Sequence, residues 1–271
     1  MSRLILGGIL KATPIPTTPI MFASSGEGSG RLWFYDGTSW AEQRPKGDAN
    51  GNWYTAGLSS DGVKMLAGEV NGRLWFYDGS TWAELRPKGD ANGSWVSCAL
   101  SADGTKIFAG DYGARLWYYN GTSWAEQQPK GNANGAWRAN AFSQDGTKML
   151  AGDLNNRLWY YNGTSWAETQ PKGNANGGWW KVAFSQNGTK MLAAELNGRL
   201  WYHNGTSWGE LRPKGDVNVQ YRGIALSPDG SKVLVGESGG RLWFYDGSSW
   251  AEQRPQGDLN LYWYGASLKY I

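Results

Sequence analysis

Three observations predict an all-β fold, a six-bladed β-propeller built of four-stranded antiparallel blades. First, a stretch beginning Arg31-Leu32-Trp33-Phe34-Tyr35 returns every 42 residues, with near-copies starting at Arg73, Arg115, Arg157, Arg199 and Arg241. Second, each copy consists of short strand-like segments separated by tight-turn residues, and none carries a helical period. Third, the two chain ends supply complementary parts of one more unit. A fixed period of this size is typical of repeat architectures, in which each unit buries its apolar faces against its neighbours.

The repeated stretch is predicted to form a β-hairpin. Leu32 and Phe34 alternate with Trp33 and Tyr35, which is the two-residue period of a strand. The return strand over residues 39–44 ends at Pro45, and because proline cannot donate to a ladder this strand is expected at the outer edge of its sheet. Between the strands, a dipeptide expected to supply the positive φ angles of a tight turn occurs in every copy: Asp36-Gly37, Asp78-Gly79, Asn120-Gly121, Asn162-Gly163, Asn204-Gly205 and Asp246-Gly247.

One full unit runs over residues 52–93. Its first strand is predicted over residues 53–58 and its second over residues 64–68, joined by a turn at Ser59-Ser60-Asp61-Gly62. The hairpin then gives the third and fourth strands, and residues 87–93 connect to the next copy. Four short strands joined by tight turns, with one longer connection per unit, describe a propeller blade.

The chain ends predict how the ring closes. Residues 263–268 match only the first strand of a blade, and the missing second strand is found in residues 20–24, which resemble residues 63–67. The last blade is therefore expected to combine residues 262–271 with residues 20–45, which leaves no unpaired blade edge. The predicted organisation is a single propeller domain over residues 20–271, preceded by an extended N-terminal arm over residues 1–19.

The N-terminal arm is apolar at first and then rich in proline. Its apolar run, residues 4–10, is too short to span a bilayer and makes a poor signal peptide, so we expect it to belong to the mature protein. Pro14, Pro16 and Pro19 favour an extended chain. Two interpretations stay open: the arm packs along its own domain, or residues 1–18 dock onto a protein assembly.

Composition and charge narrow the classes of function. The 271 residues carry 26 basic and 23 acidic side chains, mixed along the chain, so no nucleic-acid partner and no membrane insertion are expected. The lone Cys98 excludes an internal disulfide and is expected to be a small buried hydrophobe. The only histidine, His203, stands where other copies have Tyr or Phe, and no catalytic triad or metal site can be assembled around it. The sequence therefore predicts a protein that is not an enzyme and needs no cofactor or metal.

About half of every unit resembles a WD-repeat blade. Residues 225–236 read Ala-Leu-Ser-Pro-Asp-Gly-Ser-Lys-Val-Leu-Val-Gly and lead to Arg241-Leu242-Trp243, as a Ser-Pro-Asp-Gly turn leads to an Arg-Leu-Trp strand in that family. The Gly-His dipeptide of the family is absent, and Trp243 is followed by Phe-Tyr-Asp rather than directly by Asp. The resemblance therefore implies the propeller fold, but not the scaffold role that is usual for the family.

Tryptophan is unusually common, with 18 residues, and nearly all of them occupy three repeated positions. The sets on the third and fourth strands are expected in the core between blades: Trp33, Trp75, Trp117, Trp159, Trp201 and Trp243, and Trp40, Trp82, Trp124, Trp166, Trp208 and Trp250. The first-strand set directly follows the polar connection, so it is expected near the open end of a blade: Trp53, Trp95, Trp137, Trp179, Tyr221 and Trp263.

The connections between blades are the predicted binding site. In a meander the second-to-third turn and the connection emerge on the same face, so Asn71-Gly72 and residues 45–50 are expected to be neighbours, and loops on rigid scaffolds often bind ligands. Carboxylate and amide groups can bond sugar hydroxyls while a ring covers the apolar sugar face. The alternative is that these Asp and Asn side chains brace their own turns. The predicted ligand-binding residues are Asp48, Asn50, Trp53, Asp90, Asn92, Trp95, Asn132, Asn134, Trp137, Asn174, Asn176, Trp179, Asp216, Asn218, Tyr221, Asp258, Asn260 and Trp263.

A second repeated pattern places an Arg and a Glu on hairpin-joined strands beside aromatic residues. The pairs are Arg31/Glu42, Arg73/Glu84, Arg115/Glu126, Arg157/Glu168, Arg199/Glu210 and Arg241/Glu252. The pattern resembles the Arg, Glu and aromatic sites that fucose-binding six-bladed lectins place between blades, which implies sugar sites. An inter-strand salt bridge accounts for the same residues.

Two hypotheses of function follow. A multivalent lectin or adhesin would bind surface glycans through near-identical loops and gain avidity on a dense surface. A structural or display protein, such as a virion decoration, fibre or cell-surface component, would attach through its N-terminal arm. Both hypotheses place the protein on a cell surface or a virion, and they are compatible.

Overall fold

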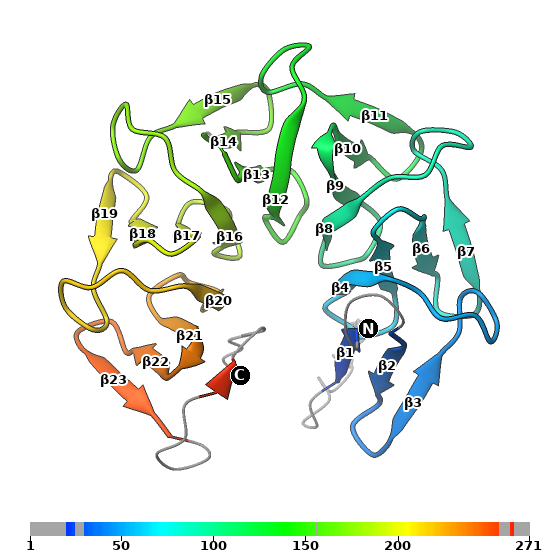
Figure 1. The fold of residues 1–271 in the computed structure, drawn as a ribbon, viewed down its shortest axis with the longest axis horizontal. Helices are drawn as coiled ribbons and strands as arrows, with labels where there is room; N and C mark the ends of the chain where they lie inside the picture. Colours follow the sequence, from blue (N-terminus) through cyan, green and yellow to red (C-terminus); the bar gives the residue numbers. More distant parts are fainter. Residues whose placement is uncertain (1–19, 25–29, 156, 255–260, 263–271) are drawn as a thin grey trace, which may run out of the picture.

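The computed structural model describes residues 20–24, 30–155, 157–254 and 261–262 of the chain. In this part every regular element is a β-strand, 24 in all, and the strands follow one another as antiparallel meanders around a central axis (Figure 1). The described residues include no long apolar helix that could cross a membrane. The fold is thus an all-β propeller built from four-stranded antiparallel meanders.

Strand bounds repeat from blade to blade. The first three four-stranded meanders are β4 (Trp53–Leu58), β5 (Met65–Glu69), β6 (Leu74–Tyr77), β7 (Trp82–Leu85); β8 (Trp95–Leu100), β9 (Ile107–Ala114), β10 (Leu116–Tyr119), β11 (Trp124–Gln127); and β12 (Gly135–Phe142), β13 (Met149–Asp153), β14 (Leu158–Tyr161), β15 (Trp166–Thr169). Two more are β16 (Trp179–Phe184), β17 (Met191–Glu195), β18 (Leu200–His203), β19 (Trp208–Leu211); and β20 (Tyr221–Leu226), β21 (Val233–Gly240), β22 (Leu242–Tyr245), β23 (Trp250–Gln253). The chain ends contribute β1 (Met21–Ser24), β2 (Leu32–Tyr35) and β3 (Trp40–Gln43), and β24 (Leu261–Tyr262).

The described residues do not form the six separate four-stranded blades that the sequence predicted. They make hydrogen-bonded sheets of three, eight, four, five and four strands. The eight-stranded sheet arises because β12 begins early enough for Gly135 and Ala136 to pair with the end of β9, which joins two meanders. β24 pairs with β21 in the same way and makes the fifth strand of its sheet.

The order of strands within a blade agrees with the prediction. Figure 1 shows the first strands β4, β8, β12, β16 and β20 nearest the axis, and the fourth strands, including β3 and β7, on the outside. The strand that ends at Pro45 is thus an outer one, as expected for a strand followed by proline.

The N-terminal strand occupies the place of a second strand, as predicted. β1 pairs with β2 in the register Met21↔Tyr35 to Ser24↔Leu32, and β5 pairs with β6 in the matching register Met65↔Tyr77 to Gly68↔Leu74. The segment 263–268, predicted to complete this blade, and the N-terminal arm, residues 1–19, lie outside the described residues.

A β-bulge interrupts the inner strands β4, β8, β12, β16 and β20 directly after the buried aromatic residue near the start of each strand. Trp53 pairs with Glu69 and Thr55 with Gly68, so Tyr54 is the extra residue without a partner across the ladder. The same shift follows Trp95, Trp137, Trp179 and Tyr221. A bulge bends the strand and re-aims one side chain, and here it separates a buried aromatic from the residue that follows it.

Apolar packing joins each blade to the next. Phe108 and Leu116 of one blade pack with Trp137, Met149 and Ala151 of the following blade. Hydrogen bonds of the outer tryptophans cross the same interfaces: Trp82 Nε1 donates to Gln43 Oε1 (3.3 Å), Trp166 Nε1 to Gln127 Oε1 (3.0 Å) and Trp208 Nε1 to Thr169 Oγ1 (2.6 Å). The inter-blade position predicted for these tryptophans is confirmed, although Trp40 keeps 49% of its surface exposed.

The hairpin turns differ in detail from the prediction. Only the glycine has a positive φ, 98° at Gly37, whereas Asp36 turns the chain with its side chain. Its Oδ1 accepts the backbone N–H groups of Thr38 (2.7 Å) and Ser39 (2.9 Å), which is an Asx turn. Asp and Asn both accept such bonds, so either residue fits this position.

Candidate functional site: the loop face

The connections between blades and the second-to-third turns lie together on one face, called here the loop face. Gly72, after the turn of one blade, pairs with Gly93 at the end of the connection that follows it. The preceding connection reaches the same turn, because Lys46 Nζ lies 2.8 Å from Glu69 Oε1 at the end of β5. The predicted proximity of Asn71-Gly72 to residues 45–50 is confirmed.

A buried carboxylate holds each connection through a lysine. The carboxylate ends the second strand of a blade and is largely shielded from solvent, while the lysine belongs to the connection that enters that blade. Removing one partner of such a pair leaves a buried charge unpaired, which makes the contact structurally important. The pairs are Lys46–Glu69 (2.8 Å), Lys88–Asp111 (2.6 Å), Lys130–Asp153 (2.7 Å), Lys172–Glu195 (2.7 Å) and Lys214–Glu237 (3.1 Å).

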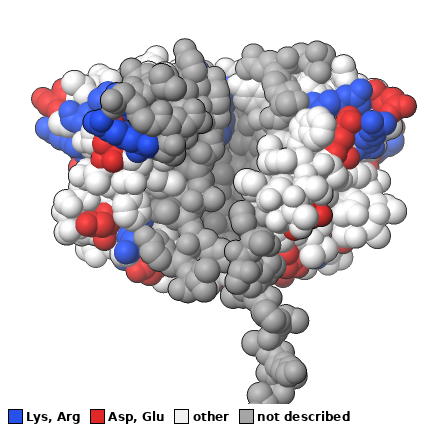
Figure 2. Space-filling view, turned by 90° about the horizontal axis from the view of Figure 1, so that it is seen from below, with Lys and Arg blue, Asp and Glu red and all other residues white. Residues whose placement is uncertain are grey.

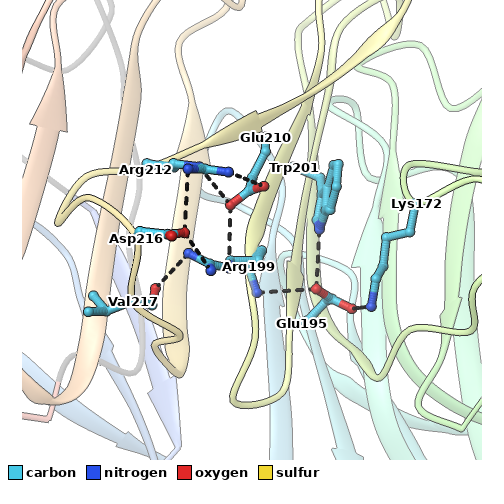
Figure 3. A network of polar contacts seen from close by, with 8 residues as sticks. All are labelled: Lys172, Glu195, Arg199, Trp201, Glu210, Arg212, Asp216 and Val217. Atoms are coloured by element: carbon cyan, nitrogen blue, oxygen red, sulfur yellow. Dashed lines mark hydrogen bonds and ion pairs between the residues drawn. The ribbon is translucent and has the colours of Figure 1, made fainter.

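In four blades, the arginine directly before the third strand clamps the connection that leaves the blade: Arg73, Arg115, Arg157 and Arg199. Arg199 lies 3.4 Å from Glu210 Oε1 and 2.8 Å from Asp216 Oδ1, and it donates to the carbonyl oxygen of Val217 at 3.2 Å (Figure 3). Arg212 completes this network with Glu210 at 3.0 Å and Asp216 at 3.4 Å. The clamp uses the guanidinium as a multiple donor, which suits the fork geometry of arginine.

The predicted Arg/Glu pairs are therefore salt bridges within each hairpin. Their N–O distances run from 3.1 Å to 3.5 Å in the pairs Arg31–Glu42, Arg73–Glu84, Arg115–Glu126, Arg157–Glu168, Arg199–Glu210 and Arg241–Glu252. Arg73 also donates to the carbonyl oxygens of Asp90 (2.7 Å) and Ala91 (2.9 Å). Because these donors brace the protein's own backbone, the pattern does not form the sugar sites that the lectin resemblance implies.

The polar members of the predicted ligand set are exposed on the loop face. These are Asp48, Asn50, Asp90, Asn92, Asn132, Asn134, Asn174, Asn176, Asp216 and Asn218. Three of the aspartates also brace their loops through ion pairs, Asp48 with Arg44, Asp90 with Arg86 (2.5 Å) and Asp216 with Arg212 (3.4 Å). Seen side-on, charged side chains of both signs gather near one rim of the molecule (Figure 2). Asp258, Asn260 and Trp263 lie outside the described residues.

The aromatic members of that set are buried, which corrects the expectation that they lie at an open blade end. Trp53, Trp95, Trp137, Trp179 and Tyr221 retain 1–4% of their surface. A glycine covers each indole so closely that a Cβ at Gly93 would stand 2.6 Å from the Trp95 ring. No room remains for a sugar on these rings, so the structure gathers the carboxylates and amides of the set but leaves the five described aromatic members unable to stack on a ligand.

Cys98 and His203 are both held toward their uncharged forms. Burial raises the pKa of the Cys98 thiol to about 12, and its Sγ lies 3.2 Å from Thr55 Oγ1. Burial lowers the pKa of the His203 imidazole, whose ring packs edge-on against Trp208 with 5.2 Å between centroids. In the described part of the chain, no three His, Cys, Asp or Glu side chains are grouped as metal ligands.

One group of side chains that meet in space escaped the sequence analysis. The bulged residues Tyr54, Arg138, Trp180 and Arg222 meet near the central axis, although they belong to four blades. Sequence variation gave little signal: the six copies place Tyr, Val, Arg, Trp, Arg and Tyr at this position, but the next two positions of the inner strand vary as much.

Comparison with known proteins defines the fold alone. No known family profile and no curated protein matches the sequence. Among solved structures, the chain is similar to the β-propeller domain of Cps50 (Swd1) from Myceliophteria thermophila, with a TM-score of 0.60 and 14% identity over 90% of this chain and 86% of that one. As many as 1650 chains of solved structures match, so the similarity identifies a widespread fold and no particular activity.

Proposed function

We propose that this propeller is a non-enzymatic binding module that recognises a macromolecular partner, most simply a protein, through its loop face. The observation that carries the proposal is the repeated display of exposed Asp and Asn side chains on loops braced by Lys–carboxylate pairs and Arg clamps. Bracing lowers the entropy lost on binding, because the loops are held before a partner arrives. Several equivalent loops on one ring also suit multivalent attachment.

A carbohydrate partner is the narrower form of the same proposal. The exposed amides support it, since they offer both donors and acceptors to hydroxyl groups. The burial of Trp53, Trp95, Trp137, Trp179 and Tyr221 counts against it, because none of these five described rings is free to cover a sugar. A protein partner needs no such ring.

Replacement of the loop-face amides tests the proposal. The variant combines Asn50→Ala, Asn92→Ala, Asn134→Ala and Asn176→Ala, whose side chains are exposed. The matched control, Gln144→Ala with Gln186→Ala, removes exposed amides from the opposite face. Binding is measured on arrayed surface glycans and on arrayed peptides, with intrinsic tryptophan fluorescence to quantify any hit.

The outcomes separate the alternatives. Saturable binding that the loop-face variant loses and the control keeps supports the proposal, and the array that gives the hit distinguishes a glycan from a protein partner. Equal binding by both variants, or no binding in either array, would count against the loop face.

We further propose that the ring closes as a sixth blade and that residues 1–18 attach the protein to a larger assembly. The register of β1 on β2 supports closure, since it leaves the free edge of β1 in the place where a first strand is required. Truncation after Tyr262 should lower the thermal midpoint and speed hydrogen exchange in residues 21–24.

Deletion of residues 1–18 should change the assembly state measured by light scattering; an unchanged state would remove support for attachment.

A further inference from the structure

His203 makes the outer hairpin of one blade differ from the others. The tip of this hairpin lies between β18 and β19 and begins with Asn204 and Gly205. The Gly205 backbone N–H donates a hydrogen bond to Nδ1 of His203 at 3.2 Å. In the other copies the equivalent residue is a tyrosine, which has no ring nitrogen to accept such a bond: Tyr35, Tyr77, Tyr119, Tyr161 and Tyr245.

The His203 imidazole is available as a neutral base. Burial lowers its pKa, while a hydrogen bond with the Thr189 backbone acts in the opposite direction. The ring packs edge-on against Trp208, with 5.2 Å between the ring centres, which restricts its orientation. Because Nδ1 accepts the Gly205 N–H, the neutral ring carries its proton on Nε2. Nδ1 is therefore placed to take a proton from the Gly205 nitrogen.

The side-chain amide of Asn204 is held by two backbone donors. Its Oδ1 accepts the N–H groups of Thr206 at 2.9 Å and Ser207 at 3.0 Å. Two N–H groups on one carbonyl oxygen polarise the C=O bond, and they stabilise the negative charge that this oxygen gains when a nucleophile attacks the carbon. The tip thus combines a base, an attacking nitrogen and an oxyanion site within four successive residues and His203.

The equivalent tip at Asp78 shows that these donors can hold an anion. Asp78 Oδ1 accepts the N–H groups of Ser80 at 2.7 Å and Thr81 at 2.9 Å. The Thr81 N–H, together with the hydroxyl and N–H of Ser80, lowers the pKa of Asp78 to about 2. Asp36 and Asp246 accept the same pair of bonds in their own hairpins. The fold therefore accommodates an aspartate at the position of Asn204.

We propose that Asn204 is a self-modification site at which His203 promotes intramolecular deamidation. His203 Nδ1 takes the proton of the Gly205 nitrogen as that nitrogen bonds to Cγ of Asn204, and the two backbone N–H groups hold the oxyanion at Oδ1. The proton passes to Nδ2, the Cγ–Nδ2 bond breaks, and ammonia leaves a five-membered cyclic imide. Water then opens the imide to an aspartyl or isoaspartyl residue, so one water is consumed and one ammonia is released.

The reaction needs no partner and occurs once per chain. The reacting groups belong to adjacent residues, so the ring closes without loss of translational freedom. The product adds one negative charge to a chain whose formal net charge is +3. The site lies on an outer hairpin, so the proposal is independent of binding at the loop face.

Two other hairpin tips provide matched comparisons within the same chain. Asn120 and Asn162 are also followed by glycine, and each Oδ1 accepts the same pair of backbone N–H groups at 2.8 to 3.0 Å. Tyr119 and Tyr161 precede them, so these tips have the oxyanion donors without the base. A difference in rate between these sites and Asn204 measures the contribution of His203.

Ageing of the purified full chain at neutral pH in water enriched in heavy oxygen tests the site, and mass spectrometry of the digested protein measures the label gained at each asparagine. We expect Asn204 to react about tenfold faster than Asn120 and Asn162, less than a positioned base contributes in an enclosed active site, because this tip is exposed. His203→Tyr, which restores the residue of the other copies, should slow Asn204 to their rate. Tyr161→His, the matched gain, should speed Asn162 about tenfold.

Three results would overturn the proposal. They are a rate at Asn204 no higher than at Asn120, an unchanged rate at Asn204 in His203→Tyr, and a rate difference that persists when the chain is unfolded in urea. The last result would assign the effect to the local sequence instead of the folded hairpin. Circular dichroism establishes that each variant is folded. If His203→Tyr does not fold, Tyr161→His decides, and an unchanged rate at Asn162 counts against the base.

Discussion

Blades that end their second strand with Glu differ from blades that end it with Asp. Glu69, Glu195 and Glu237 each accept a hydrogen bond from the indole of the third-strand tryptophan, at 3.2, 3.2 and 2.7 Å. Asp111 and Asp153 instead accept backbone N–H groups, from Ser94 at 2.8 Å and from Ala136 at 3.2 Å. In these blades the buried Nε1 atoms of Trp117 and Trp159 have no acceptor. The Glu carboxylates also accept the backbone N–H of the residue four positions later, as Glu195 does from Arg199. One methylene group thus decides whether the carboxylate reaches the indole.

The residue three positions later changes with the acid. Blades with Glu have Gly72, Gly198 and Gly240 there, whereas the blades with Asp have Ala114 and Asn156. A Cβ at Gly72 would lie 2.8 Å from Glu69 Oε2, so the longer side chain occupies the space that a larger residue would need. The repeat therefore contains two matched pairs, Glu with Gly and Asp with a larger residue.

Loss of the carboxylate should have the largest effect in either kind of blade. Glu195→Ala removes the partner of Lys172 and leaves the Trp201 indole and the Arg199 backbone N–H without their acceptor. We expect a loss of about 3 kcal/mol in the free energy of unfolding, the lower end of the range for breaking a buried pair, because Lys172 is partly exposed. Urea denaturation measures this loss in the free energy of unfolding. Glu210→Ala, in a more exposed pair, should cost about 1 kcal/mol or less; equal losses would contradict the importance given to the buried acid.

Exchange of the small residue should show that the acid and its neighbour act together. Gly72→Ala should cost about 1–3 kcal/mol, because the new methyl group overlaps Glu69. Adding Glu69→Asp should recover part of that loss, since the shorter acid vacates the space. A double-mutant cycle in urea measures the coupling, and strictly additive losses would refute the matched pair.

Conversion of an Asp blade into a Glu blade is a smaller change. Asp111→Glu with Ala114→Gly should give Trp117 Nε1 an acceptor, which is worth about 1 kcal/mol for a buried donor. Part of this gain is offset by the lost bond from Ser94 N. We expect the double variant to be more stable than Asp111→Glu alone, as measured by thermal unfolding. The reverse order would show that the backbone acceptor matters more than the indole.

Much of the fold followed from the sequence because it depends on period and turn chemistry. The 42-residue repeat, the outer strand before Pro45 and the use of residues 21–24 as a second strand are all properties of local pattern. The predicted alignment of residues 20–24 with 63–67 was one residue off, because Met21 takes the place of Met65 in the ladder. The burial of Trp53 was not predictable in this way. In the sequence, a glycine two residues before a tryptophan is compatible with a flexible loop and also with a backbone that packs closely on the ring. Only the packing distinguishes the two arrangements. The contacts of Arg138 with Tyr54 and Trp180 were missed because a bulge breaks the two-residue alternation from which side-chain direction is inferred.

A further contrast between blades lies on the face opposite the loops. Asp103 accepts hydrogen bonds from the Ser101 hydroxyl (2.6 Å) and the Thr105 backbone N–H (3.0 Å). These bonds lower the pKa of Asp103 to about 2. The equivalent residue in another blade is Asn187, whose amide does not titrate. The unfolded chain takes up a proton near pH 4 and the folded one only near pH 2. The stability that Asp103 contributes is therefore complete above pH 4 and lost as pH falls toward 2. In the Asp103→Asn variant, residue 103 should form the same turn as Asn187 does. The decline of the thermal midpoint between pH 5 and pH 2 should then become slightly shallower. An unchanged pH profile would show that Asp103 adds nothing to the acid sensitivity of this turn.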